Sequence, residues 1–436
     1  MAQKFYSCKI ERLNFVMIKT FFQKSIFKNL GPGFLLAGAA IGVSHLVQAT
    51  RAGAEFGFSL IWVLLLACLS KYPFLEFGPR FTASTGKDLI SGYKELGKLS
   101  YYTYIFITFG TMFVIQASVT IVTAGLAEQL FQLGWSPFIW SAIILGFCIA
   151  LLWIGKYSGL DLSMKIIVTL LTLVTLISVL FAFNAGTLEN ALATPTPSYW
   201  NLGGMAFLIA FMGWMPIPLD ASVWHSMWTR EKAKNTNKQL SVKNSFIDFN
   251  VGYLSASFIG LLFLLLGALV MFGRGESFSK NSVGFATQLI ELYQFLLGNW
   301  SYLLVSIAAL ITMLSTTLTV ADAYPRVLSE IMIPQDRETE ISLQKKSNLY
   351  RIGLIVIPIL SLAILYFTAK NFTYLVDFAS GLSFLSAPIL GYFNFRLVKN
   401  YIAEKDRPSK NYQVFSWICL SILILFGIGY LYIQFN

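Results

Sequence analysis

The run Met212-Gly213-Trp214-Met215-Pro216-Ile217-Pro218 decides how this chain folds, because it interrupts an apolar segment that is otherwise long enough to cross a bilayer. Proline lacks a backbone N–H and its ring clashes with the preceding helical turn, so two prolines separated by one residue cannot both sit in a regular helix. The carbonyls that are freed at membrane depth need protein, water or a ligand as hydrogen-bond partners. The run therefore predicts a broken transmembrane helix.

A second interruption is expected at Gly-Ala-Ala-Ile-Gly-Val-Ser-His, from Gly38 to His45, near the middle of the first apolar segment. A simple kink without a ligand would explain one such break. Two breaks placed five segments apart instead match transporters built from two inverted five-helix repeats, in which the first helix of each repeat is broken and the cargo lies between the breaks.

The composition of the whole chain is that of a membrane protein. Of the 436 residues 56% are hydrophobic and only 12% are charged, and the mean hydropathy is +0.66. Apolar runs of about 20 residues alternate with short polar stretches, which predicts a single all-α integral membrane domain with about eleven transmembrane helices. The predicted spans are Gly33–Phe56, Phe58–Phe77, Tyr101–Leu130, Phe138–Ile154, Met164–Phe183, Asn201–Trp228, Val251–Phe272, Ser301–Ala321, Ile352–Phe367, Tyr374–Phe395 and Val414–Ile433.

The basic residues that give the formal net charge of +11 sit in the polar stretches between the spans. They are therefore expected to set the orientation in the membrane and to face acidic lipid headgroups, and not to bind nucleic acid. Basic clusters precede the first span and follow the second, sixth, eighth and tenth. The alternate loops carry only Arg51, Arg274, Lys280 and Lys370. The positive-inside rule then predicts a cytoplasmic N-terminus, with a basic cytoplasmic segment over residues 1–30, and a C-terminus outside a bacterial inner membrane.

The run GPGFLLAGAAIGVSHLVQATRAGAEFGFSLIWVLLLA, from Gly31 to Ala67, resembles the start of the Nramp (natural resistance-associated macrophage protein) family of divalent-metal transporters. Met215-Pro216 matches the Met-Pro step of that family, and Pro388 in the tenth span fits it as well. The resemblance implies a LeuT-type fold and a metal-ion carrier. Its two repeats would cover about 31–185 and about 200–397 of the transporter domain 31–436, with an extra helix at about 412–434.

Several positions depart from the family pattern. The family's first-span Asp-Pro-Gly-Asn, whose Asp and Asn bind the metal, reads Gly42-Val43-Ser44-His45 here. The family's methionine ligand carries over to Met215 and its backbone carbonyl ligand to Met212, whereas the histidine after Met-Pro is Ile217. The glutamine of the tenth span aligns with Ser380. We therefore predict a divergent member that lacks the metal-binding motif.

The predicted cargo site consists of Gly42, Ser44, His45, Met212, Met215 and Ser380. With Gly42 in place of the carboxylate its ligands are neutral, which suits magnesium or manganese poorly. The pair His45 and Met215 would suit a softer ion such as cuprous copper, or no metal at all. His45 is equally well explained as a hydrogen-bonded structural residue.

Three further polar residues, Asp220, His225 and Glu128, are assigned coupling or lining roles. Asp220 follows the sixth-span break, where a carboxylate is costly to keep unless it functions or pairs with a cation, and His225 fits a structural role or a proton relay. Glu128 is the acid of the third span, whose expected acidic pair is missing. Lys71 and Glu76 of the second span are expected to form a pairing network at the cytoplasmic end.

The leading hypothesis is a secondary transporter that moves a small ion or solute by alternating access about the two broken spans, with a metal ion as the cargo by family analogy. One alternative keeps the fold and carries a small anion or zwitterion, such as bicarbonate or an amino acid, at the N-termini of half-helices. Another is a non-transporting membrane sensor. The chain holds two histidines and no nucleophile motif, so we expect no enzyme.

We expect no cofactor, although a metal ion as cargo and a proton or sodium ion for coupling are open possibilities. The expected partners are the lipid bilayer and the small cargo, without nucleic acid. The sequence leaves the oligomeric state open.

Overall fold

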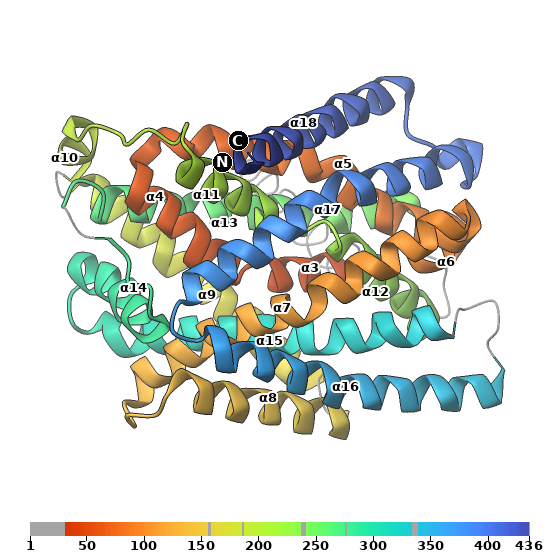
Figure 1. The fold of residues 1–436 in the computed structure, drawn as a ribbon, viewed down its shortest axis with the longest axis horizontal. Coiled ribbons are helices and arrows are strands. Elements are labelled where there is room, and N and C mark those ends of the chain that lie inside the picture. The colour runs from red at the N-terminus through yellow and green to blue at the C-terminus, as the bar shows by residue number, and fades with distance from the viewer. Residues whose placement is uncertain are drawn as a thin grey trace, which may run out of the picture.

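The computed structural model describes residues 31–155, 158–184, 187–236, 241–274, 277–333 and 339–435, and within these ranges every regular element is a helix. The basic segment 1–30, predicted to be cytoplasmic, lies outside the described residues. The long helices run side by side in one bundle, with α8 and α16 along one edge and α18 along the opposite edge (Figure 1).

The predicted spans coincide with helices or with interrupted helices. Continuous helices form nine of them: α5 (Ile61–Thr85), α7 (Lys98–Phe131), α8 (Pro137–Ile154), α9 (Ser158–Asn184), α13 (Val242–Val270), α15 (Ser301–Met332), α16 (Glu340–Thr368), α17 (Phe372–Asn400) and α18 (Lys410–Phe435). Among the described residues eight helices are long and apolar enough to cross a membrane, or nine if α9 and the short α10 (Thr187–Ala193) form one bent span. One of the eight, Ser44–Thr85, covers parts of the first two predicted spans. The two halves of the sixth span, α11 and α12, are each too short to count as a spanning helix.

The predicted interruption of the first span is confirmed. Helix α3 (Pro32–Ala40) ends where Ile41 leaves helical geometry, with φ −75° and ψ 80°. The chain resumes as a π-helix over Ser44–Ala49, which continues into α4 (Thr50–Phe56). A π-helical turn is rare and marks a local conformation that ordinary helix packing does not require.

The predicted interruption of the sixth span is confirmed as well. Helix α11 (Leu202–Trp214) ends at Met215, whose backbone is extended with φ −88° and ψ 127°, and α12 begins only at Ala221 (Ala221–Thr236). The unwound stretch is the one that holds both prolines, Pro216 and Pro218. The break therefore overlaps the predicted run from Met212 to Pro218 and extends to Asp220.

The broken helices are held tightly against their neighbours. The carboxylate of Asp248 on α13 accepts hydrogen bonds from the backbone N–H groups of Gly31 and Gly33, at 2.9 and 2.8 Å, and so caps the start of α3. A Cβ placed on Gly213 would lie 1.9 Å from the carbonyl oxygen of Ser380, which is why α11 and α17 can touch only through a glycine.

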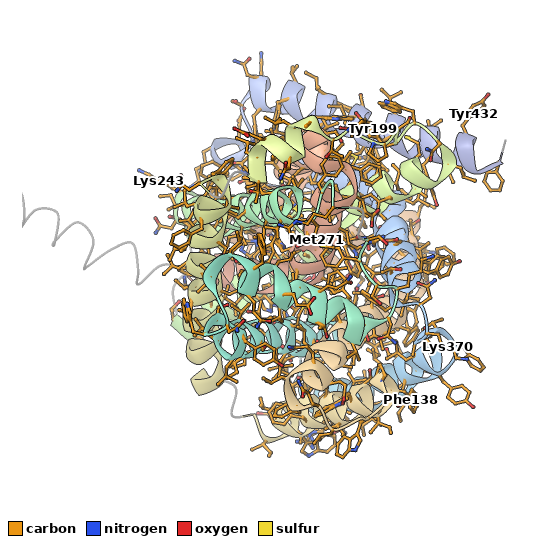
Figure 2. The ribbon with its side chains drawn as sticks, turned by 90° about the vertical axis from the view of Figure 1, so that its left-hand side faces the viewer. Phe138, Tyr199, Lys243, Met271, Lys370 and Tyr432 are labelled. Atoms are coloured by element: carbon orange, nitrogen blue, oxygen red, sulfur yellow. The ribbon has the colours of Figure 1, made fainter. Side chains whose placement is uncertain are left out.

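Short helices lie between the spans. They include α6 (Leu89–Leu96) after the second span and α14 (Ser282–Leu297) before the eighth. Figure 2 looks onto the end of the bundle that is predicted to face outward, called the outer end below, with Met271 near its middle and Phe138 and Lys370 toward its rim. The opposite end is called the inner end.

Candidate functional site

The two interruptions meet inside the bundle. The hydroxyl oxygen of Ser44 lies 3.5 Å from the carbonyl oxygen of Pro216, so the breaks of the first and sixth spans are in direct contact. A cavity of about 30 Å³ lies beside this contact, which is room for a water molecule or a small ion. Its wall is mostly apolar, with Ser44 and Thr316 as the hydroxyl groups among its lining residues.

His45 is fully buried and both of its ring nitrogens are engaged. Nε2 lies 2.8 Å from the carbonyl oxygen of Ala256, and because a carbonyl only accepts, Nε2 must carry a proton. Nδ1 lies 2.8 Å from the hydroxyl of Ser44, which also lies 2.7 Å from the carbonyl of Ala40. A metal-ligand role for His45 would require one of these hydrogen bonds to break.

Gly42 sits at the turn between α3 and the π-helix. Its N–H donates to the carbonyl of Ala40 at 2.8 Å, and a Cβ at this position would lie 2.5 Å from Oγ1 of Thr316 on α15. The Thr316 side chain therefore stands where the family's carboxylate would begin. Its hydroxyl donates to the carbonyl of Ile41 at 3.4 Å or of Thr312 at 3.3 Å.

Met215 comes together with His45 against α13. A Cβ on Gly260 would lie 2.7 Å from the Met215 sulfur and 3.6 Å from Cδ2 of His45, so both side chains pack on the bare backbone of Gly260. Met212 is also fully buried, and neither methionine is among the residues that line the central cavity. Of the two methionines, Met215 is thus the one placed beside the first-span residues.

Ser380 belongs to a polar network on the outer side of the breaks. Its hydroxyl accepts from Nε2 of Gln48 at 3.2 Å, and the same Gln48 nitrogen donates to Asp377 at 2.9 Å. The guanidinium of Arg51 binds both carboxylate oxygens of Asp377, at 2.8 and 3.2 Å, and reaches Glu55 at 3.3 Å. This outer network ties the outer half of the first span to α17.

The three residues that were assigned coupling or lining roles lie in different places. Asp220 follows the sixth-span break and accepts from the Tyr324 hydroxyl at 3.1 Å through Oδ2, while its buried Oδ1 has no hydrogen-bond partner. His225 on α12 is buried and stacked near Phe249, again without a hydrogen-bond partner. Glu128 lies near the end of α7, where its carboxylate accepts hydrogen bonds from the Gly134 N–H and the Trp140 indole.

The predicted pairing of Lys71 with Glu76 is wrong. Residues five apart on a helix point in different directions, and Glu76 instead pairs with Arg80 one turn along, at 2.8 Å. The Lys71 ammonium donates to the carbonyls of Gly213 and Ile217, at 3.1 and 2.9 Å, on the two sides of the sixth-span break. Lys71 is therefore part of the candidate site, which the sequence did not reveal.

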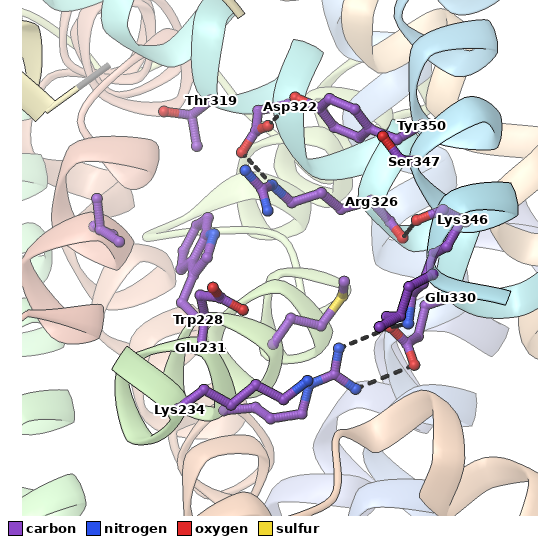
Figure 3. A pocket seen from close by; sticks show the side chains of 15 residues that line it. Trp228, Glu231, Lys234, Thr319, Asp322, Arg326, Glu330, Lys346, Ser347 and Tyr350 are labelled. Atoms are coloured by element: carbon purple, nitrogen blue, oxygen red, sulfur yellow. Dashed lines mark hydrogen bonds and ion pairs between the residues drawn. The ribbon is translucent and has the colours of Figure 1, made fainter. Parts of the chain in front are cut away.

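A larger cavity of about 410 Å³ opens toward the inner end, between α3, α12, α15 and α16. Figure 3 shows the residues of two ion pairs at its wall, Asp322 with Arg326 and Glu330 with Lys346. Glu330 pairs with Arg230 as well. Arg230 also pairs with Asp88. Leu35 lines this cavity while Ala39, one turn along α3, lines the central one. The same helices thus pass from one cavity to the other.

Within the described residues, no group of three or more His, Cys, Asp or Glu side chains is placed to hold a metal ion. The polar groups at the two interruptions are hydroxyls, backbone carbonyls, the hydrogen-bonded imidazole of His45 and the thioether of Met215, and the last two do not line the central cavity. Such a set can hold a neutral or weakly hydrated cargo, but it offers a divalent ion no carboxylate in exchange for its water.

Comparison with known proteins decides the family. The family model described as "Natural resistance-associated macrophage protein-like" matches residues 33–433. This chain belongs to the Nramp family. The resemblance that began at Gly31 is therefore confirmed over almost the full length of the sequence.

Individual relatives differ in how much of the chain they match. Uncharacterized protein PM0681 of Pasteurella multocida is 32% identical over 379 residues, which are 86% of this chain and 86% of that protein. The Divalent metal cation transporter MntH of Staphylococcus saprophyticus is 26% identical over 58% of each chain, so the match spans less than two thirds of that relative.

Solved structures show the fold. A mutant of the Eremococcus coleocola manganese transporter superimposes with a TM-score of 0.68 at 15% identity, over 93% of this chain and 87% of that one. MhsT in complex with L-phenylalanine gives a TM-score of 0.60 at 16% identity, over 92% and 97%. The Nramp membership and the LeuT-type fold implied by the sequence are both confirmed.

Proposed function

We propose that this Nramp-family chain is a secondary transporter, which moves a small cargo by alternating access about its first and sixth spans. The observation that carries the proposal is the meeting of two helix interruptions at a cavity inside the bundle, with Ser44 Oγ 3.5 Å from Pro216 O. Unwound backbone at membrane depth is tolerated where it is buried in protein or lines a cavity, and both conditions hold here.

The two ends of the bundle support this proposal. At the outer end Arg51, Asp377 and Gln48 close the space above the breaks with charged hydrogen bonds. At the inner end the cavity of about 410 Å³ comes within one turn of the central cavity along α3. A cargo path that is closed outside and open inside is one of the two states that alternating access requires.

The site favours a cargo other than a divalent metal ion, and we propose a small anion or zwitterion. Gly42 and Thr316 replace the family's carboxylate, and the buried ammonium of Lys71 lies directly behind the sixth-span break. A positive charge in a low-dielectric interior opposes a second cation nearby. A divalent metal is the second candidate, because relatives named as a divalent metal cation transporter and a manganese transporter share the family and the fold.

Uptake into proteoliposomes tests the proposal. Manganese, zinc and magnesium are compared with bicarbonate and amino acids, each with an imposed gradient of pH or sodium. We expect gradient-driven uptake of a non-metal solute that falls in Met215→Ala and His45→Ala but not in Met332→Ala, a control at an exposed methionine. Saturable manganese uptake would favour the second candidate, and no uptake of any solute would favour a sensor.

We also propose that the N-terminus is cytoplasmic and the C-terminus lies outside, as the distribution of basic residues indicates. A membrane-impermeant reagent applied to intact cells should reach a cysteine added after Asn436 and not one added before Met1. The reverse labelling would mean that the N-terminus lies outside and that the end called inner faces outward.

A further inference from the structure

The central cavity and the cavity at the inner end, called the inner cavity below, differ in what they can hold. The central cavity of about 30 Å³ has room for a water molecule or a small ion, whereas the inner cavity measures about 410 Å³. Pockets that bind small organic molecules usually measure about 300–1,000 Å³. The inner cavity is therefore the one of the two that can hold an amino acid or a molecule of similar size.

Most of the charges at the wall of the inner cavity are balanced by one another. The carboxylate of Glu330 accepts from both terminal nitrogens of Arg230, at 3.1 and 2.7 Å, and pairs with Lys346 at 2.6 Å. Arg230 also pairs with Asp88. These four side chains carry two positive and two negative charges, so together they have no net charge that would attract an ion.

Arg326 on α15 has a free edge on its guanidinium. Its Nε donates to one carboxylate oxygen of Asp322 at 2.6 Å, and the hydroxyl of Tyr350 donates to the other. The guanidinium carbon also lies 5.4 Å from the centroid of the Tyr350 ring. Within the described part of the chain, Nη1 and Nη2 of Arg326 donate to no protein group. The two N–H groups on such an edge match the two oxygens of a carboxylate.

Glu231 on α12 offers the opposite charge to the same cavity. Its side chain is exposed, and Figure 3 shows its carboxylate beside Trp228, which lies one turn earlier on the helix. Among the described residues Glu231 forms no ion pair, and Arg326 pairs with Asp322 alone. The inner cavity therefore presents a positive and a negative group from two different helices that do not pair with each other. This arrangement complements a zwitterion.

We propose that the inner cavity binds a zwitterionic amino acid with an apolar side chain, with the carboxylate on the free edge of Arg326 and the ammonium at Glu231. The side chain of the amino acid packs against Trp228 of α12 and Leu35 of α3, which line the same cavity. The inference rests on the proposed function and deepens it, because it selects the zwitterion among the proposed cargoes and places its site on the inner part of the cargo path.

The first test compares three probes that differ only in charge. L-Leucine carries both charges, isocaproate lacks the ammonium and isoamylamine lacks the carboxylate. Calorimetry with the purified full-length protein measures the affinity of each. We expect leucine to bind at least about tenfold more tightly than either analogue, because each analogue loses one charge-assisted hydrogen bond. No binding of leucine, or leucine bound no more tightly than isocaproate, overturns the proposal.

The second test assigns the two charges to their partners. Glu231→Gln should weaken leucine by about tenfold and leave isocaproate bound as tightly or more tightly, because the lost carboxylate serves only the ammonium. Arg326→Gln should weaken leucine and isocaproate alike by about tenfold, and Arg326→Lys should restore only part of this loss, since an ammonium lacks the planar edge. Leucine affinity that is unchanged in Glu231→Gln overturns the proposal, and this exposed position keeps the test valid if Arg326→Gln fails to fold.

Arg274→Gln is the matched control. The Arg274 guanidinium also lies over an aromatic ring, 4.1 Å from the centroid of Phe295, but it is at the outer end and does not line the inner cavity. Leucine affinity should not change in this variant. An equal loss of affinity in Arg274→Gln and Arg326→Gln would overturn the assignment of the site to the inner cavity.

Failure of this inference is distinguishable from failure of the proposed function, because the binding measurement needs neither a membrane nor a gradient. Gradient-driven uptake of bicarbonate by a protein that does not bind leucine would remove only the amino-acid site. Leucine binding that depends on Glu231 and Arg326, without uptake of any solute, would support the site and remove the transport function.

Discussion

The interruptions of the first and sixth spans both free backbone carbonyls from helical hydrogen bonds, but different groups meet these carbonyls at the two breaks. At the first break the neutral hydroxyls of Ser44 and Thr316 lie within hydrogen-bond distance of the carbonyls of Ala40 and Ile41, respectively. At the sixth break the freed carbonyls of Gly213 and Ile217 are met by the ammonium of Lys71. The first break therefore presents hydroxyls to the central cavity, while the second keeps a cation behind its wall. This difference is what separates the site from a carboxylate-based metal site.

The largest expected effect is on stability at the charged break. Lys71→Met removes a charged donor from two buried carbonyls, and hydrogen bonds to charged groups contribute about 1.5–3 kcal/mol each, so the loss is about 3–6 kcal/mol. Ser44→Ala at the neutral break should lose only about 1 kcal/mol. Unfolding midpoints in detergent compare the two variants, and equal losses would erase the contrast between the breaks.

A somewhat smaller loss of stability is expected when a methyl group is placed between α11 and α17 at the sixth-span break. Gly213→Ala drives a methyl group into the Ser380 backbone, which cannot turn aside, and should cost about 1–3 kcal/mol and loosen the contact between α11 and α17. Gly381→Ala is the control on α17, because a Cβ there meets nothing within 4 Å. The same unfolding measurement applies, and a Gly213→Ala protein as stable as the control would mean that the helices are not in this contact.

Gly42→Ala should be milder and reversible by a second change. Its methyl group meets the side chain of Thr316, which Thr316→Ala removes, so the double variant should recover part of the stability lost in Gly42→Ala. Residues in contact usually couple by about 0.5–3 kcal/mol in a double-mutant cycle. Additive losses in that cycle would show that Thr316 does not occupy the space beside Gly42.

The smallest expected effect is on manganese affinity, which should hardly change when two residues of the family motif are restored. Gly42→Asp with His45→Asn restores the Asp and the Asn of the family motif, but Thr316 blocks the new carboxylate and Lys71 remains beside the sixth break. We expect calorimetry with manganese to show less than about a twofold gain over the natural sequence. A large gain would mean that Thr316 yields easily and that the divergence at position 42 alone explains a loss of metal binding.

The sequence predicted the architecture well because its strongest signals are backbone effects. Pro216 and Pro218 cannot be helical together, and the hydrophobic runs are as long as a bilayer is thick. The family motif placed Gly42, Ser44, His45 and Met215 at the breaks, and the structure brings these residues together.

Much of the chemistry of the site was beyond the sequence, because it depends on contacts between distant helices. Lys71 was assigned to Glu76 from proximity in the chain, although its acceptors lie more than 140 residues away, at Gly213 and Ile217. Asp377, which binds Arg51, lies 326 residues from it and carries no local signal. A lone lysine in an apolar span without a partner one turn away was the clue that was available.

Side-specific labelling of the central cavity tests the central claim most directly. A membrane-impermeant maleimide is applied to a Val43→Cys protein in intact cells and in inside-out vesicles, with and without Arg51→Gln, which breaks the outer network. We predict labelling from the inner side in the parent protein and additional labelling from the outer side once Arg51 is replaced. Absence of labelling from both sides in both proteins would contradict a cargo path between the two interrupted helices.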